Sequence, residues 1–284
     1  MYPEKREETI FSRACKKYKY SLLPRVKHIR GTTRLKESLK ALAATGINKP
    51  GESEPIGEKE WDNLIILDAA RHDTYRETLN SNSDHRITQE SHSRGFIREN
   101  FSDGDWSDTV VITANPFYNS ESFEELTGRS LEDTFETIFQ VWETDWNSEE
   151  GTVMPDKMVE KAFTAEKLFP DKRKIIHMMQ PHHPFIDSDI QDPGFGDTRS
   201  EETEYEKVWE RTAKGEIPHQ KVVEGYLQNH RLLKPHLEKL KGLSGKTVVT
   251  ADHGNLLGEK GLYGHPPGNL EPLRKVPWDV ISQD

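Results

Sequence analysis

Two short apolar runs, far apart in the chain, each end in an aspartate, and this pair of endings restricts the fold more than any other feature. The first run, Leu64 to Leu67, leads into Asp68, and the second, residues 247–251, leads into Asp252 and His253. Buried strands of parallel sheets are short apolar runs of this kind, and in open α/β sheets binding groups collect just beyond their carboxyl ends. We therefore expect an α/β fold that brings the two strand ends to one edge of a sheet.

The three polar side chains at these strand ends are typical metal ligands. Carboxylate oxygens suit hard cations and an imidazole nitrogen suits borderline ones, so Asp68, Asp252 and His253 are expected to hold a divalent cation. These ligand types do not separate Mn, Mg, Zn and Ca. Gly254 comes next and would let the backbone pass close to a bound group. The alternative is an ordinary turn, in which Asp252 caps the loop and His253 has no ligand role.

The rest of the sequence alternates strand-like and helix-like segments. Apolar, β-branched runs predict further strands at residues 109–115, 174–180 and 276–281. Apolar residues at helical spacing predict helices at residues 91–101, 131–146, 156–169 and 220–240. This order predicts an α/β domain around a central, mostly parallel sheet. The polar segment 187–210 is expected to be a lid or a disordered loop.

Charge divides the chain into a basic extension and an acidic body. Residues 1–40 hold twelve Lys or Arg against four Glu, although the whole chain carries a net charge of −10. We expect residues 1–60 to be a basic N-terminal extension and linker, and residues 61–284 to be the catalytic domain. The extension either folds back on the acidic body or contacts an anionic membrane surface, and no nucleic-acid-binding motif accompanies it.

The sequence also indicates where the protein works. It contains no apolar stretch long enough to span a membrane, and its first residues lack the apolar core of a signal peptide. Its single cysteine, Cys15, cannot form a disulfide within the chain. We therefore expect a cytoplasmic protein, peripheral to the membrane if residues 1–40 bind anionic lipid.

Four motifs together resemble the alkaline phosphatase superfamily, and within it the short sulfatase-like proteins of archaea. They are LIILDAARHD, VVTADHGNLLGE, YGHP and LRKVPW, and they occur in the expected order between Trp61 and the C-terminus. The resemblance implies an alkaline-phosphatase-like three-layer α/β/α sandwich and a catalytic metal held by Asp68, Asp252 and His253. The two-metal branch of the superfamily carries Asp-x-x-x-His in mid-chain, and this chain lacks that pattern between residues 115 and 245, so one metal ion is expected.

The resemblance also implies a nucleophile at the start of the helix after the first strand. Ser93 suits this role, because a hydroxyl at a helix start lies beside free backbone N–H groups that stabilise an anion. Ser91 is the alternative, and either serine could be an ordinary helix cap. Typical sulfatases carry Cys-x-Pro-Ser-Arg at this place, and its absence argues against sulfate-ester hydrolysis by their usual route.

Histidines and one arginine supply the remaining candidate groups. His182 matches the family histidine that contacts the substrate anion, His183 is its neighbour, and His265 in YGHP is a second contact. Two histidines flanked by prolines at a strand end are held stiffly enough to be functional. Arg71, which follows the first strand, is either the structural partner of a carboxylate or an anion clamp.

The expected function is that of a metal-dependent hydrolase or phosphotransferase for phosphoesters. Ser93 would be the nucleophile, Arg71 and His182 would assist catalysis, and His183 and His265 would bind the substrate. That substrate would be a small-molecule, glycan-linked or lipid-linked phosphoester. Two alternatives stay open: a sulfuric-ester hydrolase, and a catalytically degenerate protein that binds a polyanion or partner through its basic extension.

Overall fold

The computed structural model describes residues 51–190 and 208–283, and the structural statements below concern these residues. The basic segment 1–40 and most of the polar segment 187–210 lie outside them, so the expectations about membrane contact and a lid stay predictions. Within the described part of the chain, no helix combines the length and the apolar character that a membrane crossing requires.

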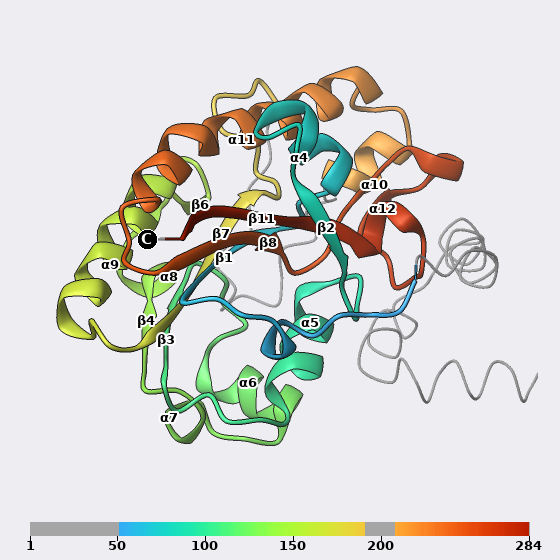
Figure 1. Ribbon diagram of the computed structural model, residues 1–284. Coiled ribbons are helices and arrows are strands. Elements are labelled where there is room, and N and C mark those ends of the chain that lie inside the picture. Colours follow the sequence, from blue (N-terminus) through green and yellow to red (C-terminus); the bar gives the residue numbers. More distant parts are fainter. Residues whose placement is uncertain (1–50, 191–207, 284) are drawn as a thin grey trace, which may run out of the picture.

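A central sheet of seven strands runs through the fold (Figure 1). Its strands are β1 (Asn63–Asp68), β2 (Asp84–Ile87), β3 (Thr109–Thr113), β4 (Thr137–Gln140), β7 (Arg173–Pro181), β8 (Lys246–Ala251) and β11 (Lys275–Gln283). They lie in the order β2-β11-β8-β1-β7-β3-β4. The five strands from β8 to β4 are parallel, and β11 is antiparallel to both of its neighbours. The mostly parallel sheet expected from the sequence is thereby confirmed.

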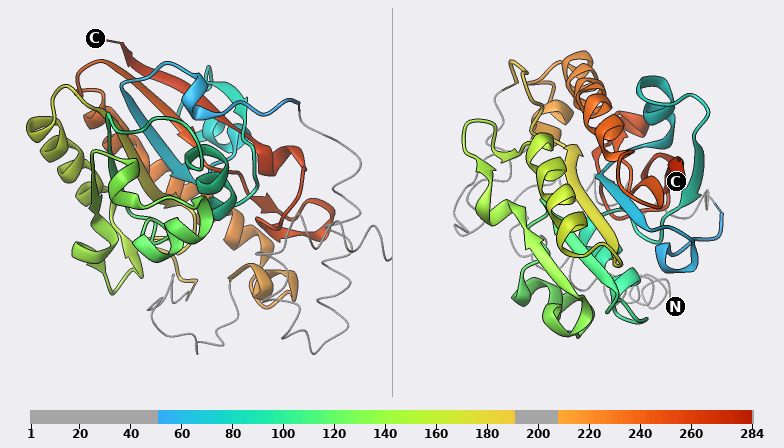
Figure 2. Two further views of the ribbon diagram at one scale, coloured as in Figure 1. Left: turned by 90° about the horizontal axis from the view of Figure 1, so that it is seen from below. Right: turned by 60° about the vertical axis from the view of Figure 1, so that its left-hand side comes forward.

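Helices cover both faces of this sheet. The α-helices of the described residues are α4 (His72–Thr78), α5 (Ser93–Phe101), α6 (Ser120–Thr127), α7 (Leu131–Thr134), α8 (Val141–Thr144), α9 (Pro155–Leu168), α10 (Val208–Ala213), α11 (His219–Leu240) and α12 (Glu271–Arg274). Because side chains alternate along a strand, Ile65 and Leu67 of β1 enter a core shared with α9 and α11. Leu64 and Ile66 enter a second core shared with α5 and α6. The expected three-layer α/β/α sandwich is confirmed, and Figure 2 shows the sheet between its helices.

Short elements complete the fold around the sheet. They are the 3-10 helices η1 (Ile56–Glu58) and η2 (Glu259–Gly261) and the two-residue strands β5 (Trp146–Asn147), β6 (Thr152–Val153), β9 (Leu256–Leu257) and β10 (Tyr263–Gly264). The end of the predicted linker packs on the domain, since the side chain of Ile56 is fully buried. The main-chain N–H of Ile56 donates to Asn100 Oδ1 at 3.1 Å, and Trp61 Nε1 donates to the carbonyl of Ile56 at 2.9 Å.

The helix predicted over residues 131–146 is wrong. The segment instead forms α7, the edge strand β4 and α8. Its aromatic residues do not share one helical face: Phe135 and Ile138 pack with the α5 side of the sheet, whereas Phe139 and Trp142 pack with the α9 side. The apparent i, i+3, i+4 spacing therefore comes from apolar residues that serve two opposite faces of the sheet.

Candidate functional site

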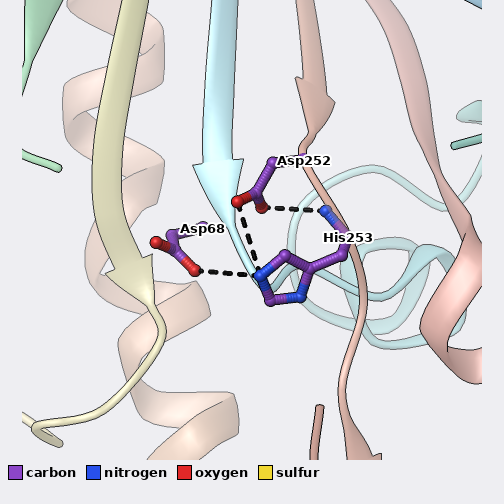
Figure 3. Close-up of side chains that lie close together, drawn as sticks. All are labelled: Asp68, Asp252 and His253. Atoms are coloured by element: carbon purple, nitrogen blue, oxygen red, sulfur yellow. Dashed lines mark hydrogen bonds and ion pairs between the residues drawn. The ribbon is translucent and has the colours of Figure 1, made fainter. Parts of the chain in front are cut away.

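The carboxyl ends of β1 and β8 lie side by side and carry three clustered polar groups. These parallel strands pair up to Leu67 and Ala251, so the next residue of each strand is an aspartate at the same edge. One oxygen each of Asp68 and Asp252 and one ring nitrogen of His253 lie within 4.8 Å of one another (Figure 3). All three side chains are buried. The side chains that the sequence placed at one strand edge thus lie together.

The imidazole of His253 is held so that one nitrogen faces the two carboxylates. Its Nδ1 lies 2.8 Å from the carbonyl oxygen of Gly254, and because a carbonyl only accepts, Nδ1 carries the proton. In the neutral ring, Nε2 then presents a lone pair. This nitrogen is 3.5 Å from Asp68 Oδ1 and 3.4 Å from Asp252 Oδ2. A backbone-oriented histidine of this kind is typical of metal ligands.

In each aspartate, one carboxylate oxygen accepts hydrogen bonds and the other faces the cluster. Asp252 Oδ1 accepts from the main-chain N–H groups of Ala69, at 3.1 Å, and His253, at 2.8 Å. Asp68 Oδ2 accepts from Asn115 Nδ2 at 3.2 Å and faces the hydroxyl of Ser93 at 3.4 Å. Asp68 Oδ1 and Asp252 Oδ2 have no donor among the described residues.

These groups form a set of acceptors that fits a cation. Buried polar atoms are normally hydrogen-bonded, yet two carboxylate oxygens converge here without a donor, beside an imidazole nitrogen whose hydrogen-bond contact is the Ser93 hydroxyl at 3.4 Å. Oxygen and nitrogen ligands in this combination suit Mn, Mg, Zn or Ca to different degrees. Burial and the nearby charge of Asp252 raise the pKa of Asp68 well above its ordinary value, although hydrogen bonds from Ser93 and Asn115 act in the opposite direction. Two such carboxylates therefore need either a bound proton or a bound cation.

Two buried basic residues flank the carboxylates. The side chain of Arg86 is fully buried, and it donates to Thr250 Oγ1 at 2.8 Å and to the carbonyl of Ala251 at 2.6 Å, immediately before Asp252. Burial lowers the pKa of Arg86 to about 10, so the guanidinium keeps its charge near neutral pH. His177 on β7 lies with Nε2 3.7 Å from Asp252 Oδ2, and burial lowers its pKa to about 4. Arg86 thus supplies one fixed positive charge and His177 none.

The residue after Asp68 has an unusual backbone conformation. Ala69 has a φ of 63°, in the left-handed region that non-glycine residues rarely adopt. Its N–H donates to Asp252 Oδ1, and its carbonyl accepts from the Tyr226 hydroxyl at 2.6 Å. Backbone strain of this kind persists where the surroundings hold it in place, and it concentrates at functional sites.

The structure separates the two candidate serines. Helix α5 begins at Ser93, whose buried hydroxyl lies 3.4 Å from Asp68 Oδ2 and 3.4 Å from His253 Nε2. The hydroxyl of Ser91 instead donates to the carbonyl of Pro266 at 3.1 Å and accepts from the N–H of Gly268 at 3.2 Å. Ser93 therefore belongs to the cluster, and Ser91 fastens the loop that follows His265.

The remaining predicted histidines extend the cluster in a row. The ring centroid of His265 lies 4.5 Å from that of His253 and 5.2 Å from that of His182. His182 Nε2 and His265 Nε2 are 3.1 Å apart, and the rings of His182 and His183 are 4.2 Å apart. Burial and the neighbouring imidazoles of His253 and His182 lower the pKa of His265 well below its ordinary value. The neutral imidazole of His265 can donate to or accept from a bound ligand.

Two further residues make close contacts within the chain itself. The Arg71 guanidinium binds Asp73 through both carboxylate oxygens, at 2.8 and 2.5 Å, and Glu259 at 2.6 Å. These contacts are those of a structural carboxylate partner, the commoner of the two roles considered, and the role of an anion clamp stays a prediction. Gly254 is required for packing against the chain itself, because a Cβ there would lie 1.9 Å from the carbonyl oxygen of Pro272.

Sequence reasoning missed several residues of the site, and one of them carried a usable signal. Asn115 ends the run that predicted a strand and lies two residues beyond the end of β3, so the rule that identified Asp68 also applied to it. Arg86 lies on β2, a strand that the sequence did not indicate. Tyr226 and Asn229 lie on the predicted helix α11, where nothing in the pattern distinguishes them from core residues.

Comparisons with known proteins give structural neighbours only. No family model matches the sequence, and no curated protein matches it. Among solved structures, the chain is similar to the soluble domain of lipooligosaccharide phosphoethanolamine transferase A from Neisseria meningitidis, with a TM-score of 0.48, 14% identity, and coverage of 81% of this chain and 77% of that chain. It is also similar to the lipoteichoic acid synthase LtaP from Listeria monocytogenes, with a TM-score of 0.44, 13% identity, and coverage of 85% of this chain and 71% of that chain. A third similar structure is a protein in the alkaline phosphatase superfamily from Vibrio parahaemolyticus, with a TM-score of 0.43, 11% identity, and coverage of 89% of this chain and 70% of that chain. The finer resemblance to archaeal sulfatase-like proteins stays a prediction.

Proposed function

We propose that this protein is a metal-dependent enzyme that transfers phosphoryl groups from phosphoesters to water or to an acceptor alcohol, with Ser93 as nucleophile. One observation carries the proposal: the Ser93 hydroxyl lies 3.4 Å from both Asp68 Oδ2 and His253 Nε2, beside two carboxylate oxygens that lack donors among the described residues. A divalent cation bound by Asp68, Asp252 and His253 would favour the alkoxide form of Ser93 and polarise a phosphoryl oxygen.

The residues of the chain would act in two steps. In the first, Ser93 Oγ gives its proton to solvent and bonds to phosphorus as the bond from phosphorus to the leaving oxygen breaks, and the leaving oxygen takes up a proton from solvent. In the second, water or an alcohol bonds to phosphorus and gives a proton to solvent, while Ser93 Oγ leaves and is reprotonated. The positive end of α5 would stabilise negative charge on the phosphoryl oxygens, although the N–H of Gly95 in its first turn already donates to His92 Nδ1 at 2.9 Å. The Nε2 atoms of His182 and His265 are 3.1 Å apart, and the proton between them would supply an N–H donor for the same oxygens.

The contacts favour this proposal over the alternatives. A protein that only bound a polyanion through its basic extension would have no use for two unpartnered carboxylate oxygens buried at adjacent strand ends. A sulfatase of the usual kind needs a cysteine at the nucleophile position, and Ser93 stands there. The substrate class that we propose is a small-molecule, glycan-linked or lipid-linked phosphoester.

Serine substitutions test the proposal. The purified protein, loaded in turn with Mn, Mg, Zn and Ca, is assayed with aryl phosphodiesters and aryl phosphomonoesters. Ser93→Ala should lower turnover on the order of a thousandfold or more, because it removes the nucleophile, and it should leave metal affinity nearly intact. Ser91→Ala is the matched variant, and it should cost about 1–2 kcal/mol of stability and far less turnover.

The covalent step has its own readout. Acid quenching during turnover, followed by peptide mass spectrometry, should find phosphoserine at Ser93 in the wild-type protein. If Ser91→Ala abolishes turnover and Ser93→Ala does not, the nucleophile is misassigned. If both variants turn over normally, water is the attacking group and the covalent mechanism is wrong.

A further inference from the structure

One buried side chain holds the loop that carries His182 and His183. Asn229 of α11 is fully buried, and its Nδ2 donates to the carbonyls of His182, at 3.0 Å, and Pro184, at 2.9 Å. The same nitrogen also lies 3.4 Å from the carbonyl oxygen of Pro181, the first residue of the loop 181–186. Asn229 Oδ1 accepts from the N–H of Ile186 at 3.0 Å. The whole amide is therefore engaged by this loop.

The loop needs such a partner for a chemical reason. Pro181 and Pro184 have no N–H, so this stretch cannot form a regular ladder, yet its carbonyls are buried and require donors. A primary amide supplies two donors and one acceptor in one plane. Aspartate has the same shape but no N–H to give when ionised, and a leucine of similar size has neither group. Asparagine is thus the residue that satisfies both the carbonyls and the N–H.

The same helix also holds the metal-ligand strand end. Tyr226 lies three residues before Asn229, on the same face of α11, and its hydroxyl donates to the carbonyl of Ala69, next to Asp68. At the other end of the loop, the N–H of His182 donates to the carbonyl of Asp68 at 3.1 Å. One rigid helix therefore contacts both the strand end with the carboxylates and the loop with the imidazoles.

We propose that Asn229 is a positioning residue, which fixes His182 at a set distance from the Asp68, Asp252 and His253 cluster. The proposal rests on the proposed function in so far as His182 contacts the phosphoryl group during transfer. Asn229 touches neither that group nor the metal ligands' side chains. Its effect passes through the loop carbonyls, so its loss should change the rate of the chemical step more than it changes metal affinity.

The test compares two isosteric changes at buried asparagines. Asn229→Asp replaces the amide donors by a carboxylate that faces carbonyl oxygens. Asn63→Asp is the matched control: Asn63 is equally buried, at the opposite end of β1, and its Nδ2 donates to the carbonyl of Ser244 at 2.8 Å. Both changes should lower the melting temperature, but only the first should disturb the histidine loop.

Three readouts separate positioning from plain loss of stability. In Asn229→Asp, kcat should fall roughly a hundredfold, as expected for a small misplacement of a reacting group, while the dissociation constant of the metal stays within about threefold. The ring NMR signals of His182 in the metal-loaded protein should shift. Lowering the pH should restore part of kcat, because the introduced carboxyl, once protonated, can donate one hydrogen bond. Asn63→Asp should show none of these effects.

The outcomes distinguish this proposal from the proposed function. If Asn229→Asp leaves kcat and the His182 signals where Asn63→Asp leaves them, Asn229 is merely structural. If metal affinity falls as much as kcat, the helix supports the ligands and not the histidine loop, and the positioning role is wrong. If the wild-type protein turns over no phosphoester with any metal, the proposed function fails, and the NMR comparison still decides whether Asn229 positions His182.

Discussion

Replacing Asp68 by asparagine should make the metal-free protein more stable, although the position is buried and central. Oxygens of Asp68 and Asp252 lie within 4.8 Å of each other, and at that separation two charges repel by about 3 kcal/mol at an effective dielectric constant of about 20. Protonating one carboxyl near neutral pH costs a comparable amount, about 4 kcal/mol. The amide keeps the shape, still accepts from Asn115, and offers a donor toward Asp252. We expect a gain of about 1–3 kcal/mol in the free energy of unfolding.

The same change should abolish the response to metal. A cation at a hundred times its dissociation constant stabilises a protein by about 2.7 kcal/mol. Asp68→Asn removes one ligand charge and places an N–H group where the cation would lie, so this increment should vanish. The wild-type protein should therefore be less stable than Asp68→Asn in a chelator. When metal is added, the wild-type protein should gain more stability than the variant does. Each kcal/mol corresponds to a shift of about 2–4 °C in Tm.

Thermal and urea unfolding, each in chelator and with saturating Mn, Mg, Zn or Ca, measure both effects. Asp279→Asn is the matched control, because Asp279 is also buried but is fully partnered by Tyr75, at 2.8 Å, and Asn80, at 3.0 Å. This control should lose stability, by about 1–2 kcal/mol, and keep the full metal response. A metal-free Asp68→Asn protein that is less stable than the wild type would refute the electrostatic reasoning. A variant that still gains stability with metal would show that Asp68 is not a ligand.

Three further predictions concern pH and packing. Burial lowers the pKa of His230 to about 3, so the unfolded chain binds a proton that the folded protein refuses. The contribution of His230 to stability is full above pH 6.5 and should fall by about 1.4 kcal/mol per pH unit below it, so His230→Gln should reduce the slope measured by urea titrations between pH 7 and pH 5 by that amount. Because the pKa of Asp68 is raised, a cation must displace a proton from this carboxyl group. Calorimetry should therefore find that metal affinity decreases as the pH is lowered, and that about one proton is released per metal ion bound. Gly254→Ala should cost about 1–3 kcal/mol in thermal unfolding and weaken metal binding, since the added Cβ would overlap the carbonyl of Pro272; an unchanged melting temperature would contradict the packing argument.

The sequence predicted the parts of this fold that depend on neighbouring residues. Asp68 and Asp252 end apolar runs, and parallel pairing of those runs is enough to bring them to one edge. The error over residues 131–146 arose because an edge strand between two short helices can place aromatic residues at helical intervals. Strand β2 escaped notice because half of its four residues are exposed and its buried Arg86 looks like a surface residue.

Sequence patterns could not predict which side chains contact one another. Arg71 follows a strand end as an anion clamp would, but whether it meets a phosphate or a carboxylate depends on Glu259, which reaches it from a distant loop. The choice between Ser91 and Ser93 likewise depended on Pro266 and Gly268, whose loop occupies the first hydroxyl. Such pairings follow from how loops at one sheet edge pack together, and local spacing does not encode that packing.

The features of this edge that lower stability all involve the same few atoms. Ala69 is held in a left-handed conformation, and the N–H group that this conformation presents is bonded to Asp252 Oδ1. That bond leaves Asp252 Oδ2 free to face His253 Nε2 and the unpartnered oxygen of Asp68. An apolar strand end would avoid both the backbone strain, about 1–3 kcal/mol, and the buried charges. Because each unfavourable feature directs a lone pair toward one point, we interpret them together as the structure of a ligand site, which bound metal would stabilise.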